Sequence, residues 1–135
     1  MSKSKIPDLK SIAMPPIKEY LEAVQRDGSK LCAGDVMRET VEWLRANGCE
    51  SVVSAQMVEQ YAMSVARWVH LEEMISKYGY IAKHPTTGAA MQSPYVTMAQ
   101  GYLKQAAAIR AEILLLIKDA RPTVTATVRE VVYGG

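Results

Sequence analysis

Two pairs of carboxylates come nearest to a pattern for acid–base or metal chemistry. Glu39 and Glu42 stand three positions apart, which would place them on one face of a helix, whereas the adjacent Glu72 and Glu73 would point in different directions. A metal or acid–base site needs a histidine or a third carboxylate beside such a pair, and neither pair has one. We therefore interpret both pairs as solvated helix faces.

The histidines and cysteines form no metal-binding or nucleophilic motif. Cys32 and Cys49 lack the spacing of zinc ligands and are too few for a disulfide scaffold, so we expect free thiols. His70 lies between apolar residues of a predicted helix, which favours a hydrogen-bonded packing role, and His84 precedes a proline, which favours a structural role in a turn. The sequence also has no glycine-rich phosphate loop. It thus predicts no catalytic residue, no metal site and no cofactor.

Basic side chains are the remaining candidates, and their chemistry is the binding of phosphate. The chain of 135 residues holds 16 Lys+Arg and 14 Asp+Glu, for a net charge of +2. The distribution is uneven, because residues 35–75 hold three basic and seven acidic side chains between two basic ends. We predict that DNA contacts belong to these ends. The candidates are Lys3, Lys5 and Lys10 in the N-terminal tail, Lys18, Arg26 and Lys30 in or after a first helix, and Lys77 and Lys83 beside a hairpin.

The elements that must position these side chains are mainly α-helical. Residues 1–14 lack apolar periodicity and are predicted to be a flexible basic tail. Residues 15–78 are predicted to be a helical, DNA-binding unit in which two successive helices have the order of a helix-turn-helix. Its first helix would open at Pro15-Pro16, show Ile17, Tyr20, Leu21 and Val24 on one face and end at Gly28. The second would be capped by Asp35 and end at Asn47-Gly48, and the third would be capped by Ser54 and end at Gly79, with its length allowing a break within 64–68.

Residues 79–135 are predicted to contain a small β-hairpin, a long helix and a short terminal strand. The hairpin covers 79–92 and turns at His84-Pro85, and Ser93-Pro94 starts a helix that ends at Ala120. Residues 123–128 alternate with a period of two, which indicates a strand. The long helix has two apolar stripes, so we expect one to face its own domain and the other a second subunit. The predicted oligomerisation residues are Tyr95, Val96, Ala99, Tyr102, Leu103, Ala106, Ile109, Ile113, Leu116 and Ile117.

Short motifs in this order resemble a known family. They are Val58-Glu59-Gln60-Tyr61-Ala62, Lys77-Tyr78-Gly79-Tyr80, His84-Pro85 with Gly88, and Ser93-Pro94-Tyr95. Together they make residues 35–120 similar to the small terminase subunit of tailed double-stranded DNA phages. The resemblance implies a homo-oligomeric ring in the host cell cytoplasm that recognises viral DNA for packaging. It also implies a large terminase partner that carries the ATPase and nuclease activities.

Two other functions stay open at this point. Helices 35–47 and 54–78 would also suit a dimeric helix-turn-helix transcription regulator, although the candidate reading helix holds Glu59 and only Arg67 as a cation. A phage structural or adaptor protein that does not bind DNA is the other alternative. No apolar run is long enough to cross a membrane, so we expect no membrane partner.

Overall fold

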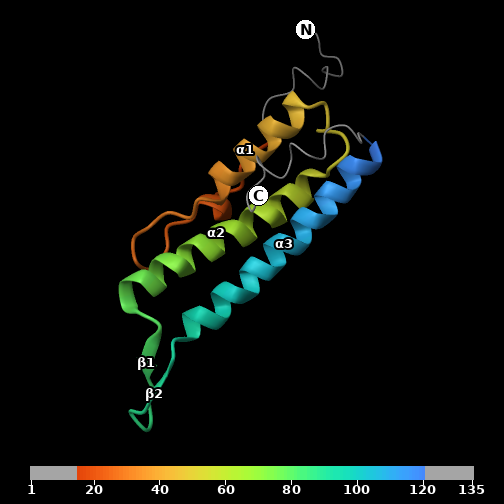
Figure 1. The fold of residues 1–135 in the computed structure, drawn as a ribbon. Helices are drawn as coiled ribbons and strands as arrows, with labels where there is room; N and C mark the ends of the chain where they lie inside the picture. Colours follow the sequence, from red (N-terminus) through yellow and green to blue (C-terminus); the bar gives the residue numbers. More distant parts are fainter. Residues whose placement is uncertain (1–14, 121–135) are drawn as a thin grey trace.

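Three helices side by side and a projecting β-hairpin make up the computed structural model, which describes residues 15–120. The long helices α2 and α3 run antiparallel, α1 lies along the other side of α2, and the hairpin joins α2 to α3 at one end of the molecule (Figure 1). The elements are the 3-10 helix η2 (Glu19–Glu22), α1 (Ala33–Ala46), α2 (Ala55–Tyr78), β1 (Ile81–Lys83), β2 (Ala90–Gln92) and α3 (Pro94–Ala120). The prediction of a mainly helical fold with a small hairpin is confirmed. The predicted tail 1–14 and strand 123–128 lie outside the described residues.

The helix predicted from Pro15 to Gly28 is wrong. Only η2 is helical there, and the chain turns extended at Ala23 and forms a β-bridge between Val24 and Lys30. Local bonds explain the difference, because the Asp27 carboxylate accepts hydrogen bonds from both the amide and the hydroxyl of Ser29. Of the predicted apolar face, Leu21 is fully buried, whereas Val24 is 70% exposed. We call residues 24–30 the Asp27 turn.

The ends of α1 and α2 test the capping and stop residues that were predicted for these helices. Helix α1 begins at Ala33, two residues before Asp35, whose predicted capping role is therefore wrong; Asp35 lies in the first turn and pairs with Arg38 at 3.0 Å. Helix α2 is capped as predicted, since the Met57 amide donates to Ser54 Oγ at 3.1 Å. It runs without a break to Tyr78, and Gly79 ends it with φ +86°.

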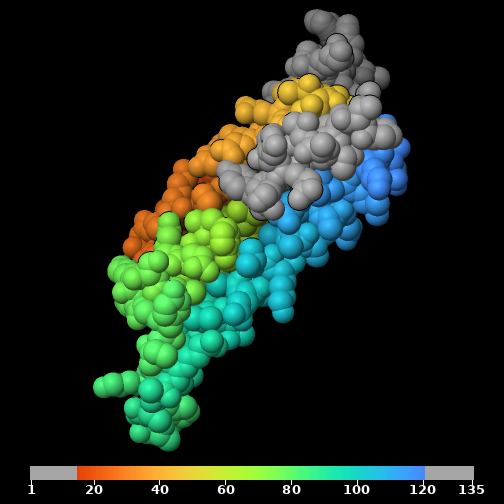
Figure 2. Space-filling model, in the orientation of Figure 1, coloured from red at the N-terminus to blue at the C-terminus, as the bar shows by residue number. Residues whose placement is uncertain are grey.

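The hairpin and the start of α3 confirm the predictions for residues 79–94. Ile81 pairs with Gln92 and Lys83 with Ala90 in an antiparallel register. Between the strands, His84 Nδ1 accepts hydrogen bonds from the backbone amides of Thr86 and Thr87. This is the structural role expected for His84. Ser93 is buried and accepts from the Tyr95 amide, so it caps α3. In Figure 2 this hairpin projects from the lower end of the molecule.

Two separate apolar clusters hold the helices together. The main cluster joins η2, α1, the first half of α2 and the second half of α3, and includes Leu21, Leu44, Tyr61 and Ile113. A smaller distal cluster contains Leu71, Ile75 and Ala99, surrounded by half-buried Trp68, Val96 and other side chains of α2 and α3. Helix α1 contributes nothing to the distal cluster, whose side chains come from α2 and α3.

Candidate DNA-binding and assembly surfaces

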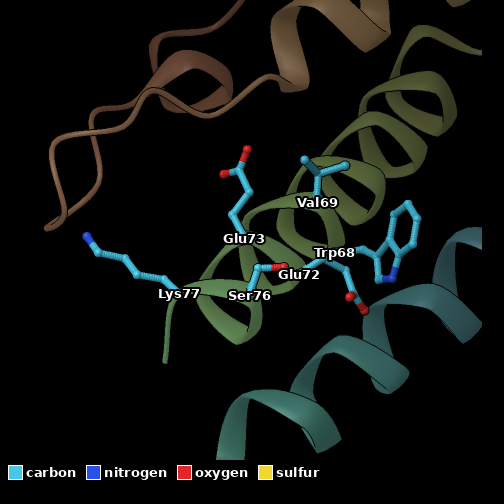
Figure 3. A pocket seen from close by; sticks show the side chains of 6 residues that line it. All are labelled: Trp68, Val69, Glu72, Glu73, Ser76 and Lys77. Atoms are coloured by element: carbon cyan, nitrogen blue, oxygen red, sulfur yellow. The ribbon is translucent and has the colours of Figure 1, made fainter. Parts of the chain in front are cut away.

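The carboxylate pairs are not joined into a site. Glu72 and Glu73 line a shallow hollow of about 550 Å³ on α2, and their side chains point in different directions, as predicted (Figure 3). Within residues 15–120, no three histidine, cysteine or acidic side chains are grouped so that they could hold a metal ion. Burial raises the pKa of the half-buried Cys32 thiol, which makes it a poor nucleophile at neutral pH.

His70 has the hydrogen-bonded packing role expected from the sequence. Its Nε2 lies 3.0 Å from Asp27 Oδ2, and this bond fastens the Asp27 turn to α2. A second bond, from Arg67 to the side chain of Gln25 at 2.9 Å, holds the same turn. The Ser29 hydroxyl and amide, followed by His70, hold the pKa of Asp27 well below its usual range.

The lowered pKa of Asp27 predicts an acid-sensitive turn. Since folding favours the ionised carboxylate, its stabilising contribution is complete above about pH 4 and is lost as the pH falls further. We expect Asp27→Asn to lower the melting temperature at pH 7 and to reduce the loss of stability between about pH 5 and about pH 2. Thermal unfolding across this range measures both effects. Glu42→Gln, at an exposed carboxylate of α1, is the control and should keep the wild-type acid dependence.

Lys18, one of the predicted DNA contacts, has its charge engaged within the chain. Its Nζ lies 3.2 Å from Glu59 Oε2, and the Tyr20 hydroxyl donates to Glu59 Oε1. The hydrogen bond with Glu59 raises the pKa of Lys18, and the hydrogen bond from Tyr20 lowers the pKa of Glu59. Lys18 therefore fixes the segment before η2 to α2.

Four of the predicted cations gather at the hairpin end of the molecule. Arg26 and Lys30 are exposed in the Asp27 turn, which the His70 bond places against the second half of α2. Lys77 is exposed in the last turn of α2 and extends toward the chain segment before α1 (Figure 3). Lys83 is exposed at the end of β1. We call Arg26, Lys30, Lys77 and Lys83 the cationic end. Lys3, Lys5 and Lys10 lie outside the described residues.

A second sequence feature of the hairpin end, the absence of acidic residues, was not predicted. From Met74 to Ala111 the chain contains no Asp or Glu, yet it contains Lys77, Lys83, Lys104 and Arg110. In the fold this stretch forms the end of α2, the hairpin and about the first two thirds of α3. A stretch without carboxylates imposes no local repulsion on phosphate, and scanning the sequence for missing acidic residues would have revealed it.

The α1–α2 unit does not offer a comparable surface. Residues 46–66, which include the connection and the first half of α2, contain no Lys or Arg. The two charged residues noted on the candidate reading helix take part in packing: Glu59 binds Tyr20 and Lys18, and Arg67 binds Gln25. Of the predicted DNA contacts within residues 15–120, the exposed cations other than Lys18 therefore lie at the hairpin end.

Helix α3 separates its predicted oligomerisation residues into two sets. Ala99, Ala106, Ile113 and Ile117 are buried within the chain itself, in the two clusters against α2. The remaining six are half-buried or exposed among the described residues: Tyr95, Val96, Tyr102, Leu103, Ile109 and Leu116. Met98 and Leu115, which were not predicted, are also exposed. Exposed apolar side chains on more than one side of a helix are a common feature of interfaces.

These features define a mainly helical protein whose exposed surfaces include a cationic end and apolar side chains of α3. None of the helices within 15–120 is long and apolar enough to span a membrane. The sequence model of the phage terminase small subunit family matches residues 33–127, so the chain belongs to that family. The family acts in phage DNA packaging and is generally non-catalytic, with DNA and the large subunit as its partners. Comparisons with curated proteins and with solved structures gave no match.

Proposed function

We propose that this protein recognises viral DNA for packaging as a homo-oligomeric ring and recruits the large terminase ATPase/nuclease. The cationic end carries the proposal, because four exposed cations from three separate segments lie toward the same end of the molecule. Four cations in one chain give weak binding, but repetition around a ring multiplies the number of phosphate contacts. The apolar stripes of α3 support the assembly that this repetition needs.

The dimeric transcription regulator suits these surfaces less well. Such a protein reads bases with the second helix of its helix-turn-helix and contacts phosphates with flanking cations. The connection before the second helix and the first half of that helix, residues 46–66, have no cation, and Arg67 after them binds Gln25. A packaging subunit that contacts the DNA backbone from the hairpin end agrees better with the charge distribution.

Lys77→Ala/Lys83→Ala tests the DNA surface. Each lysine that contacts phosphate adds about one unit to the slope of log affinity against log salt, so the double variant should flatten this slope and weaken DNA retention at low salt. Filter binding of a double-stranded fragment at several salt concentrations measures both quantities. Lys118→Ala is the matched control, since Lys118 is an exposed lysine in the last turn of α3, away from the hairpin. Equal slopes for wild type and the double variant would remove the cationic end from the DNA contact.

A further inference from the structure

We infer that the proposed assembly is built head to tail: one side of the α2–α3 pair in each protomer packs against the opposite side of the pair in the next. The inference rests on the proposed assembly and adds the two surfaces that meet. The two sides consist of different residues of α2 and α3, and both are described below. When two different surfaces meet, an open oligomer keeps one free surface of each kind at its two ends. Further protomers can therefore add by the same contact until the ring closes.

The first surface, the Trp68 side, is a groove. Trp68 lies between α2 and α3 (Figure 3) and lines two neighbouring hollows. One is the hollow with Glu72 described above, and the other, of about 370 Å³, is mainly apolar and extends toward the middle of α3. The α3 residues that line this second hollow are Leu103, Ala106, Ala107 and Arg110. Two of these residues are alanines, whose small side chains leave room in the groove for large side chains of another chain.

The second surface, the Met98 side, is a ridge on the other flank of the same helix pair. Tyr102 and Gln105 face a different hollow there, which they share with Met63 and Arg67 of α2. Continuing along α3 with helical spacing, the ridge consists of Met98, Tyr102, Gln105, Ile109 and Leu116. Met98 is 48% exposed and Leu116 is 38% exposed, while Tyr102 and Ile109 are half-buried. Their steps of four, three, four and seven positions keep them on one face of the helix, as in a helix that packs on another.

Apolar character and height favour a second copy of this chain as the occupant of the groove. The groove is lined mainly by apolar side chains, and the ridge of the same chain offers Met98 and Leu116 as exposed apolar groups. If neighbouring protomers are related by rotation about an axis parallel to the helices, residues at the same height meet. Tyr102 of the ridge is then level with Leu103 of the groove, since consecutive residues differ by only about 1.5 Å along a helix. The contact thus brings apolar groups of two different surfaces together.

Cysteine cross-linking of the full chain tests the two surfaces. In a Cys32→Ser/Cys49→Ala background, Leu103→Cys marks the groove and Gln105→Cys marks the ridge. The two positions are about 3 Å apart in height on different flanks of α3. After treatment with a short bis-maleimide, we expect the double variant to give a ladder of covalent oligomers on a denaturing gel. Each single variant should stay a single chain, and a co-expressed mixture of the two should give covalent dimers only.

The controls separate failure of this inference from failure of the proposed assembly. Light scattering of each variant before cross-linking shows whether it assembles, and Ala107→Cys/Gln105→Cys is a second pair that leaves Leu103 in place. Covalent dimers from Gln105→Cys alone, or assembled double variants that give no ladder with either pair, would overturn the head-to-tail contact and leave the assembly standing. A wild-type chain that is monomeric would overturn both proposals.

Discussion

Met98→Glu/Leu116→Glu is expected to convert the assembly into folded monomers whose affinity for DNA is about 10²–10⁴-fold lower. The two substitutions place carboxylates on the ridge of α3, where burial by a neighbouring protomer would leave them unpaired. The fold should survive, because neither side chain belongs to the two buried clusters. The loss of DNA affinity follows from the loss of multivalency, since the cationic end of each monomer is unchanged. Light scattering, circular dichroism and filter binding measure assembly, fold and affinity in turn.

Leu115→Glu is the matched control for this variant. Leu115 is even more exposed than Leu116 and is its immediate neighbour, but it lies about 100° away around α3 and outside both packing surfaces. It should therefore keep the wild-type mass and DNA affinity. If Leu115→Glu dissociates the assembly and the double variant does not, α3 packs on its neighbour with a different face.

Ile113→Ala is expected to have the largest effect on folding. Ile113 is fully buried in the main cluster, where it ties α3 to the helices before it. Truncating a buried isoleucine removes apolar contacts and leaves a cavity, so the free energy of unfolding should fall by about 2–5 kcal/mol. Urea denaturation in the Met98→Glu/Leu116→Glu background gives this value without a contribution from assembly. Leu115→Ala, two residues away and exposed, should change it by less than about 0.5 kcal/mol, and similar losses for the two variants would place Ile113 outside the core.

The parts of the fold that were predictable carry local stop and start signals. Ser54 and Ser93-Pro94 begin helices with side-chain caps, and Gly79 ends α2 in a conformation with positive φ. Each of these signals acts within a few residues, so no tertiary information is needed to interpret it. The segment before α1 had only apolar periodicity to support a helix, and the hydrogen bonds of Asp27 with Ser29 and His70 decide its structure instead.

The predicted DNA contacts stay predictions, and the way in which the fold groups them could not be predicted from the sequence. Lys77 and Lys83 are close in sequence, but Arg26 and Lys30 join them through a bond between Asp27 and a histidine 43 residues later. Likewise, the engagement of Lys18 depends on Glu59, 41 residues away. Long-range pairs of this kind carry no mark in one sequence, so the sequence analysis treated these lysines alike. The two sides of α3 were separable only once α2 and its Trp68 were in place.

The division of the interior into two clusters makes the chain modular. The main cluster secures α1, η2 and the paired middle of the molecule, whereas the distal cluster is built only from residues near the hairpin. Mutations in the hairpin and in the adjoining turns of α2 and α3 are therefore insulated from the rest of the core. Evolution can change the length, charge or sequence of this end, and with it the DNA contacts proposed for it, while the scaffold is inherited unchanged.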